Sequence, residues 1–243
     1  MKKISILFAM AILVLIGLVG CRPYDVPQFI EVGTNESAYV IPLDTDTDLK
    51  TEDQVAVNTE AYYKKAMVSV KKIQIHHKWE QRGRWHSNGD WVPTEKVIIV
   101  NHTPVSGRWI QDTNEAIKVE TKGSQGIQVP MTFDARIVKE DGPLYLSNYG
   151  TKSLMDVLNT EVNHYFAAFC NEAFHQVEYK DANAQRDEIV KPAVASTIEY
   201  FKTQGITITQ MSVYDGLIFD DPTLQDEINK LKSETFYLRK KCK

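Results

Sequence analysis

The sequence predicts an α+β fold, in which a sheet-rich first part is followed by helices. Apolar and polar residues alternate over residues 117–121 and again over residues 127–137, with turn-forming residues 122–126 between them. This period of two is typical of a strand pair with one solvent-facing side. After Gly150 the apolar spacing changes to three and four residues, which is typical of amphipathic helices. Residues 206–213 then predict a further strand.

Residues 1–20 are expected to be a lipoprotein signal peptide. Lys2 and Lys3 precede an almost unbroken apolar run, which ends in Leu-Val-Gly-Cys at residues 18–21. A charged head, an apolar run and small residues before a cleavage site are the marks of a secretory signal. The four-residue ending resembles the bacterial lipoprotein signal, in which cleavage between Gly20 and Cys21 follows acylation of the Cys21 thiol. This resemblance implies an anchor of several acyl chains on Cys21, enough for stable attachment to a bilayer.

An uncleaved membrane-spanning helix is the alternative, although the run is shorter than the roughly 20 residues that span a bilayer. Both alternatives place the lysines inside and the rest of the chain on the periplasmic or extracytoplasmic side. In enterobacterial lipoproteins, an Asp directly after the acylated Cys retains the protein in the inner membrane. Arg22 occupies that position here, which favours the outer membrane. The sequence leaves open which membrane holds the anchor and whether the source is a bacterium or a phage.

Composition and cysteine usage narrow the functional classes further. The chain has 28 basic and 32 acidic residues, and loss of Lys2 and Lys3 with the signal changes the net charge from −4 to −6. A mildly acidic body argues against nucleic acid as a partner. Cys170 lies in an apolar helical stretch and is expected to be an inert buried thiol. A Cys170–Cys242 disulfide, or a bridge between subunits through Cys242, remains the alternative.

Residues 21–28 form a polar tether, and short strands are expected to follow at residues 29–32 and 38–42. The acidic loop at residues 44–48 lacks the Gly and distal Glu of a calcium-binding loop, so a solvated loop is expected. A strand at residues 67–75 slips phase and predicts a bulge or bend. Asn88-Gly89 is the better of two hairpin turn signals, with Arg82-Gly83 the other. Residues 97–100 predict a buried strand, and residues 108–110 begin another extended segment.

Three helices are predicted in the second part of the chain. The first has an apolar face that consists of Leu154, Leu158, Val162, Tyr165, Phe166 and Phe169. The second covers residues 186–203, and because Pro192 disfavours a helix interior its first turn is expected near that residue. Asp221-Pro222 is a good N-cap and first-turn pair. It opens a short C-terminal helix within residues 221–243, expected to run from Pro222 to Leu238.

Several strings are similar to the SPFH family, also called band 7 or the stomatin–prohibitin superfamily. Arg-Asp-Glu-Ile at residues 186–189, followed by a helix and Gln-Gly-Ile-Thr-Ile at 204–208, resembles that family's Arg-Glu-Glu-Ile helix and Gly-Ile-x-Val strand. Phe-Asp-Asp-Pro at residues 219–222 with Ile228 resembles its acidic entry to the C-terminal helix. Residues 117–122 resemble its Thr-Lys-Asp hairpin, with Gly123 in place of the Asp. The Trp-rich insert at residues 79–91 resembles a bacterial and phage branch.

The resemblance implies an SPFH-like domain at residues 29–220, with a curved antiparallel sheet followed by helices. It also implies a non-catalytic scaffold that self-associates at a membrane surface, with the membrane bilayer and other copies of the chain as partners. Some family members regulate membrane proteases, which is a third alternative. Most relatives continue into a long coiled coil, whereas this sequence has only residues 221–243 there.

No residues form a recognisable catalytic pattern, so the sequence predicts no enzyme and no cofactor beyond the covalent lipid. Asp187 and Glu188 lie at a predicted helix start, where the helix dipole favours negative charge. His76 and His77 point to opposite faces of a strand and cannot bind one ion together, and with His86 they give no metal site.

Two surfaces are candidate interaction sites. The first is a contact surface for an envelope component or lipid, which consists of Trp79, Trp85, Trp91, Arg82 and Arg84. Trp is an amphipathic contact residue, although the three Trp side chains could equally cover a small sheet as a mini-core. The second is an oligomer seam on the final helix, which consists of Leu224, Ile228 and Leu231. Packing of this helix on its own domain is the alternative.

Overall fold

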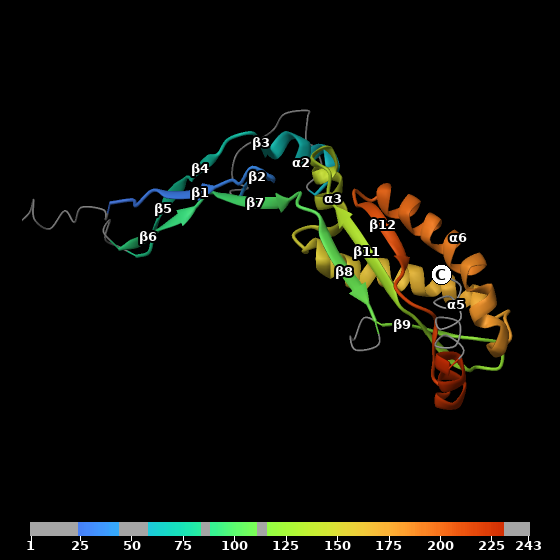
Figure 1. The fold of residues 1–243 in the computed structure, drawn as a ribbon. Helices are drawn as coiled ribbons and strands as arrows, with labels where there is room; N and C mark the ends of the chain where they lie inside the picture. The colour runs from blue at the N-terminus through green and yellow to red at the C-terminus, as the bar shows by residue number, and fades with distance from the viewer. Residues whose placement is uncertain (1–23, 44–57, 84–87, 111–115, 231–243) are drawn as a thin grey trace, which may run out of the picture. The chain divides into compact units, whose positions relative to one another are not determined.

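The computed structural model describes residues 24–43, 58–83, 88–110 and 116–230. The chain divides into two compact units, the first Met1–Val55 with Lys65–Val100 and the second Ala56–Lys64 with Asn101–Lys243. Both contain small antiparallel sheets, and the helices α3 to α6 belong to the second unit (Figure 1). The predicted α+β class is therefore confirmed.

The first unit is built from short antiparallel strands. They are β1 (Gln28–Glu31), β2 (Glu36–Pro42), β3 (Met67–Val68), β4 (Lys72–Ile75), β5 (His77–Gln81), β6 (Gly89–Pro93) and β7 (Glu95–Asn101). Strand β1 pairs with β4, β5 pairs with β6, and β2 lies between β3 and β7. The break between β3 and β4 at residues 69–71 is the bend that the phase slip predicts.

The core of the first unit is small. Ala38 and Tyr39 of β2 are fully buried, and Ile98 and Val100 of β7, the strand next to β2 in the sheet, are also buried. Ile99 is 40% exposed, so residues 97–100 alternate between the two faces of β7. The prediction of a continuously buried strand there is wrong, because a strand of a sheet with one solvated face buries only every second residue.

Strands β5 and β6 form the predicted hairpin, with a different turn from the one expected. Gln81 pairs with Gly89 at the end of the ladder, and Arg82 N donates to the Asn88 carbonyl. Gly89 is therefore already a strand residue, and Asn88-Gly89 does not form a two-residue turn. Gly83, with a φ of +104°, lies inside the longer connection instead.

The second unit contains two three-stranded antiparallel sheets. One has the order β12 (Thr207–Val213), β11 (Met131–Arg136), β8 (Val105–Trp109), and the other β13 (Ile218–Phe219), β10 (Gly126–Val129), β9 (Ile117–Glu120). The β9–β10 hairpin confirms the predicted pair, but residues 127–137 are not one strand. The buried Pro130 separates β10 from β11 and sends them to different sheets. A proline has no N–H to donate to a neighbouring strand, so Pro130 ends β10 although apolar and polar residues alternate on both sides of it.

Helices make up the rest of the second unit. They are α2 (Glu60–Ala66, which extends into the first unit), α3 (Gly142–Tyr149), α4 (Leu154–Val157), α5 (Asn163–Phe174), α6 (Ala182–Lys202) and a helix at residues 222–230. Two 3-10 turns, Lys139–Asp141 and Tyr179–Asp181, lead into α3 and α6. Helix α3 lies before Gly150, although the sequence predicts helices only after that residue. Its Pro143 in the first turn and Gly150 at its C-terminal cap are ordinary boundary signals.

Helices α4 and α5 are joined through a π-helical turn, Leu158–Val162. Leu154, Leu158, Val162 and Phe166 are buried as predicted, whereas Tyr165 and Phe169 are only half-buried. The fully buried Cys170 completes this face. The extra residue of a π turn shifts the helical phase, so the buried stripe differs from one drawn on an unbroken α-helix.

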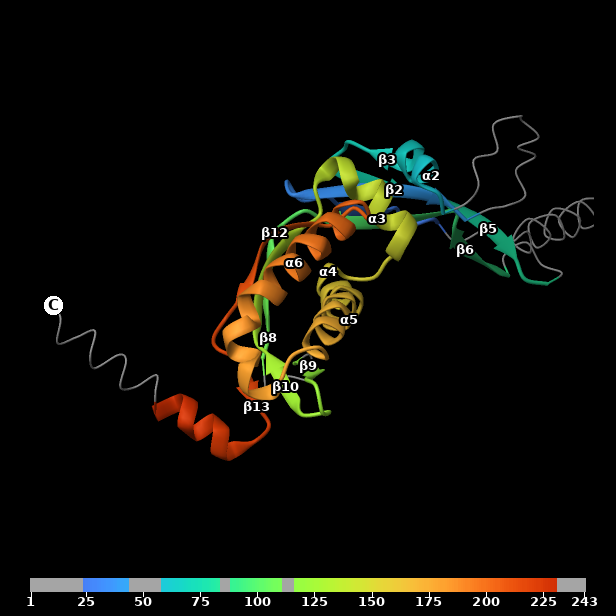
Figure 2. The same ribbon diagram turned by 90° about the vertical axis from the view of Figure 1, so that its right-hand side faces the viewer.

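The π turn and α5 contact the sheet β12–β11–β8 through Trp109. Trp109 is fully buried, with its ring centroid 4.6 Å from that of Phe133 and 6.4 Å from that of Phe166 on α5. Its indole N–H donates to Asn159 Oδ1 in the π turn, at 3.1 Å. Helices α5 and α6 lie together beside the strands of this unit (Figure 2).

Helix α6 is longer than predicted, since it begins at Ala182 and passes through Pro192. The expected first turn near Pro192 is wrong. A proline inside a helix removes one backbone hydrogen bond, and the tertiary burial of Val190, Ala193, Thr197 and Phe201 on this helix offsets that loss. Asp187 is accordingly in the second turn rather than the first, and it pairs with Arg186 at 2.8 Å.

Gly107 of β8 gives a test of this core. A Cβ at this position would lie 2.3 Å from Cζ of Phe133, which packs against Trp109. Replacing Gly107 by Ala should lower the free energy of unfolding by about 1–3 kcal/mol, because the ring has to move within a packed core. Chemical denaturation followed by circular dichroism measures this change. Ser106→Ala, on the exposed side of the same strand, is the matched control and should have little effect.

Candidate functional site

Several residues of the predicted sites lie outside the described residues, including the whole of the lipidation site. These residues are Gly20, Cys21, Arg84, Trp85, His86, Leu231 and Cys242, together with the acidic loop at residues 44–48. The described members of the Trp-rich surface are Trp79, Trp91 and Arg82, and those of the oligomer seam are Leu224 and Ile228.

The structure brings Trp79 and Trp91 together on the β5–β6 hairpin. They are direct cross-strand partners, with ring centroids 5.4 Å apart and planes inclined by 66°. Both side chains are half-buried. An edge-to-face aromatic pair contributes stability beyond its area, and a two-stranded ribbon has little else to stabilise it. This pair therefore forms the mini-core of the hairpin while part of each ring stays accessible.

Arg82 lies at the end of the same hairpin. Its guanidinium is 2.9 Å from Asp90 Oδ2, and both side chains are largely exposed. An exposed pair of this kind contributes little to stability. Because Asp90 and Trp91 are adjacent strand residues, this ion pair lies on the face of the hairpin opposite the aromatic pair.

The side chain of His77 is largely buried, unlike that of its neighbour His76. Its side chain is 5% exposed, whereas that of His76 is 68% exposed. Nδ1 of His77 lies 3.3 Å from Asp25 Oδ1, so the segment before β1 contacts this hairpin. His76 Nδ1 lies 3.2 Å from Glu95 Oε2. The two histidines have different partners and do not form a joint site.

Gly89 tests the architecture of the hairpin. A Cβ here would lie 2.3 Å from the Glu80 carbonyl oxygen and 2.8 Å from Cζ2 of Trp79. Gly89→Ala should displace the Trp79 ring and increase amide hydrogen exchange in residues 77–93 about tenfold or more. Exchange followed by mass spectrometry measures this, and Asp90→Ala, which removes only the exposed ion pair, should change it far less. Unchanged exchange in Gly89→Ala would contradict the packing of Trp79 on Gly89.

The C-terminal helix begins at the predicted cap. Asp221 Oδ1 accepts hydrogen bonds from the Thr223 amide at 2.9 Å and from the Thr223 hydroxyl at 2.6 Å. These bonds lower the pKa of the Asp221 carboxyl, so the cap is complete above the ordinary Asp pKa and is lost as the pH falls through the lowered value. Leu224 and Ile228, one turn apart, are half-buried, which leaves apolar surface for a partner.

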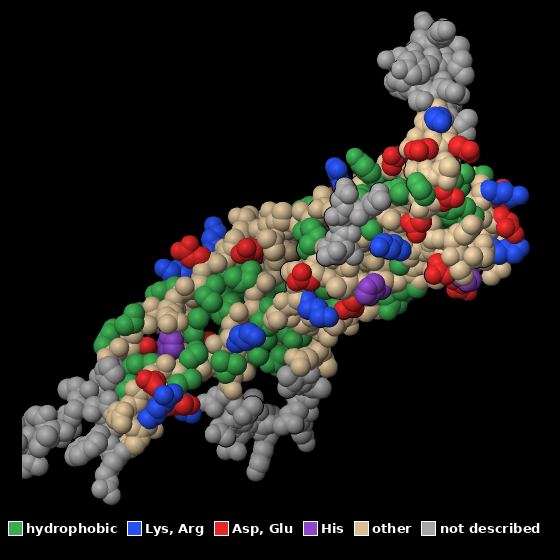
Figure 3. Space-filling view, turned by 90° about the horizontal axis from the view of Figure 1, so that it is seen from below, with side chains coloured by type: hydrophobic (Ala, Val, Ile, Leu, Met, Phe, Trp, Pro, Cys, Tyr) green, Lys and Arg blue, Asp and Glu red, His purple; other side chains and the backbone are tan. Residues whose placement is uncertain are grey.

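Cys170 is a free, buried cysteine, and burial raises the pKa of its thiol to about 12. This agrees with the inert thiol expected from the sequence. Across the described ranges, no three His, Cys, Asp or Glu side chains are grouped so that they could hold a metal ion. On the face seen in Figure 3, the described basic and acidic side chains are interspersed, without a continuous basic stripe.

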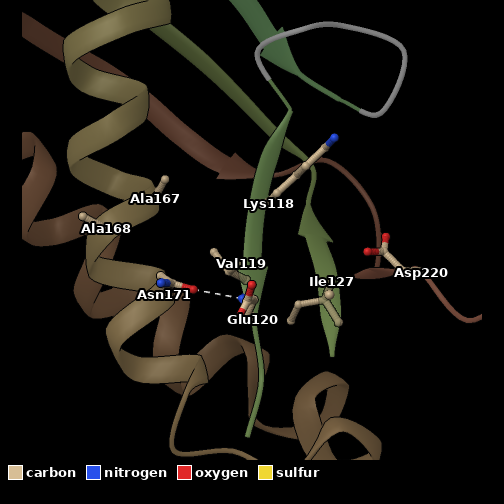
Figure 4. Close-up of a pocket in the computed structure, with 9 residues that line it drawn as sticks. Lys118, Val119, Glu120, Ile127, Ala167, Ala168, Asn171 and Asp220 are labelled. Carbon is tan, nitrogen blue, oxygen red and sulfur yellow. Dashed lines mark hydrogen bonds between the residues drawn. The ribbon is translucent and has the colours of Figure 1, made fainter. Parts of the chain in front are cut away.

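The second unit has a cleft that the sequence did not indicate. It has a volume of about 440 Å³ and lies between strand β9 and helix α5, with β10 and the end of β13 alongside (Figure 4). Its lining residues are Lys118, Val119, Glu120, Gly126, Ile127, Ala167, Ala168, Asn171 and Asp220.

Helix α5 closes one end of this cleft by bonding the outer edge of β9. Asn171 Oδ1 accepts the Glu120 amide at 2.9 Å, and His175 Nδ1 lies 3.3 Å from the Glu120 carbonyl oxygen. Beyond it the Lys122 amide donates to the Val177 carbonyl at 2.9 Å. The Lys122 ammonium pairs with Glu178 at 2.8 Å, which raises the pKa of Lys122 and lowers that of Glu178.

Asp220 lies on the opposite side of the cleft. Its amide donates to the Gly126 carbonyl at 3.2 Å, and its carboxylate occupies the space that a Cβ of Gly126 would fill, 2.1 Å from Oδ2. A glycine at position 126 therefore lets this carboxylate lie over β10. Sequence reasoning treated Gly126 only as a turn residue, and no local signal connects it with a residue 94 positions later.

No protein-family model matches this chain, and no curated protein matches its sequence. No helix in the described ranges is both long and apolar enough to cross a membrane.

Proposed function

We propose that this chain is a membrane-anchored lipoprotein of SPFH type, which acts as a non-catalytic scaffold by self-association at the membrane surface. The observation that carries the proposal is the signal ending in Leu-Val-Gly-Cys at residues 18–21, joined to the SPFH-like strings at residues 186–208. The anchor gives the location, and the family resemblance gives the mode of action.

The described residues support this proposal in two ways. Tyr24 and Val26 are 85% and 72% exposed, which suits a short tether between a lipid on Cys21 and strand β1. Leu224 and Ile228 leave part of an apolar stripe uncovered on the C-terminal helix. Attachment of many copies to one bilayer raises their effective concentration, so a weak contact suffices for association.

The lipid anchor is tested by Cys21→Ser. The wild-type protein should carry acyl chains by mass spectrometry and sediment with membranes, and the variant should carry none because it lacks the acceptor thiol. Cys242→Ser is the matched control and should stay acylated. A mature wild-type protein that is unacylated and freely soluble would refute the anchor, and cross-linking in membranes that gives monomers alone would refute the scaffold.

The Trp79–Trp91 pair favours a second candidate, an envelope- or lipid-binding module. Two half-buried indole rings on one face of the hairpin, with the exposed Arg82 guanidinium at its end, offer contacts for a lipid headgroup or a sugar. The two rings also stabilise the hairpin. If both were replaced, a loss of binding could not be distinguished from a loss of hairpin structure.

Milder changes separate these two roles. Arg82→Glu should weaken binding to phosphatidylglycerol vesicles at least fivefold while the hairpin stays intact, because the variant repels an anionic surface. Binding is measured by vesicle co-sedimentation and hairpin integrity by hydrogen exchange. Arg108→Glu, on strand β8 of the other unit, is the control. Equal vesicle binding by wild type and Arg82→Glu would argue against this candidate.

A further inference from the structure

The outer edge of strand β9 is only partly covered. Asn171 and His175 bond the Glu120 peptide group, and the Val177 carbonyl bonds the Lys122 amide. Peptide groups two residues apart in a strand point the same way. The N–H and C=O of Lys118 must therefore point to this same edge, one step further along.

The opposite edge of β9 confirms this alternation. The Thr121 amide donates to the Gln125 carbonyl within the β9–β10 hairpin, so Thr121 and Val119 turn their peptide groups inward. Ala167 and Ala168 of α5 line the same cleft as Lys118, and their methyl groups offer no hydrogen bond. No α5 group within the described ranges bonds the Lys118 peptide. Among the described residues, the Lys118 peptide group therefore has no hydrogen-bond partner on this edge, and an added strand would supply one.

The charges at the cleft favour a basic segment. Glu120 and Asp220 contribute carboxylates on its two sides, against the single ammonium of Lys118. The amino group of Lys118 points away from Glu120 (Figure 4). A strand added beside Lys118 would place alternate side chains toward the small Ala167–Ala168 surface and toward Glu120.

The chain itself contains such a segment. Residues 238–243 read Leu-Arg-Lys-Lys-Cys-Lys, with four cationic side chains after one apolar residue. Leu238 suits the alanine surface and Arg239 suits Glu120. These residues lie outside the described part of the chain.

We propose that the β9–α5 cleft binds residues 238–243 of a second copy of this chain, added as a short strand along Lys118. The proposal rests on the self-association proposed above and names its contact.

Distance favours a second copy over the chain's own cleft. The C-terminal helix starts at residue 222, two residues after Asp220 in the cleft wall. The described part of this helix, residues 222–230, is about 14 Å long at 1.5 Å per residue. Residues 231–243 contain no Gly, Pro, Asn or Asp for a tight reversal toward the cleft of the same copy.

The resulting contact is head-to-tail, because the cleft of one copy takes the C-terminal residues of the next. Contacts of this type close into rings or extend into open filaments. Every interior copy would then use both its cleft and its C-terminal residues.

Cysteine cross-linking tests the contact in membranes that contain the full-length, acylated protein. One copy carries Ala168→Cys with Cys242→Ser, and it is co-expressed with the wild-type chain, which retains Cys242. A short bis-maleimide should join residue 168 to Cys242 in a dimer, and any such product is intermolecular by design. Cys170 is buried and stays unreactive.

Matched variants test specificity. Glu199→Cys, exposed on α6, replaces Ala168→Cys as the control and should give at least fivefold less product. Glu120→Lys should lower the yield from Ala168→Cys by a similar factor, and so should raising the ionic strength from about 0.05 M to about 0.5 M. Lys118→Cys is a second attachment point if Ala168→Cys fails to fold, as judged by circular dichroism.

The outcomes separate the two proposals. Equal yields from positions 168 and 199 would overturn the cleft contact. So would a product found only within single chains when Ala168→Cys is made in a chain that keeps Cys242. Loss of the product while a lysine-reactive cross-linker still gives oligomers would overturn the cleft contact and leave the scaffold standing. Monomers with both reagents would overturn the scaffold as well.

Discussion

Burial of Trp109 is the constraint on which the second unit depends. The ring is fully enclosed between Phe133 of the sheet and Phe166 of α5, and its N–H needs the Asn159 oxygen. A buried indole without a partner is costly, so the π turn that presents Asn159 is tied to this packing. The same phase shift fixes which side of α5 meets strand β9. The position of Asn171, and with it the closed end of the cleft, follows from the arrangement around Trp109.

Much of this fold was predictable from the sequence, because local patterns dominate there. The alternation in β9 and β10, the spacing of Leu154, Leu158 and Val162, and the Asp221 cap all act within a few residues. The errors arose where a distant partner decides. Pro130 divides an apparently continuous strand between two sheets, and α6 continues through Pro192 because its buried face compensates for one missing bond. Ile99 is exposed because a strand on a one-sided sheet buries alternate residues only.

The candidate sites divide in the same way. The Trp79–Trp91 pairing follows from a hairpin register that the sequence could place only approximately, since the turn is longer than Asn88-Gly89 suggested. The cleft had no sequence signal at all. Its parts come from two strands of one hairpin, a helix some 50 residues later and Asp220, and Glu120 meets Asn171 across 51 positions. Such a site depends on topology rather than on a motif.

The division of the chain between the two units limits how it can be dissected. Residues 56–64 belong to the second unit, yet both flanking stretches belong to the first, so the backbone passes from one unit to the other at residues 55–56, 64–65 and 100–101. Neither unit is therefore one uninterrupted stretch of sequence. Truncation at residue 100 would leave residues 56–64 in the N-terminal fragment. The rest of the second unit would then lack them. A single protease cut between the units would not release either one, and isolating the larger unit would require relinking its two pieces.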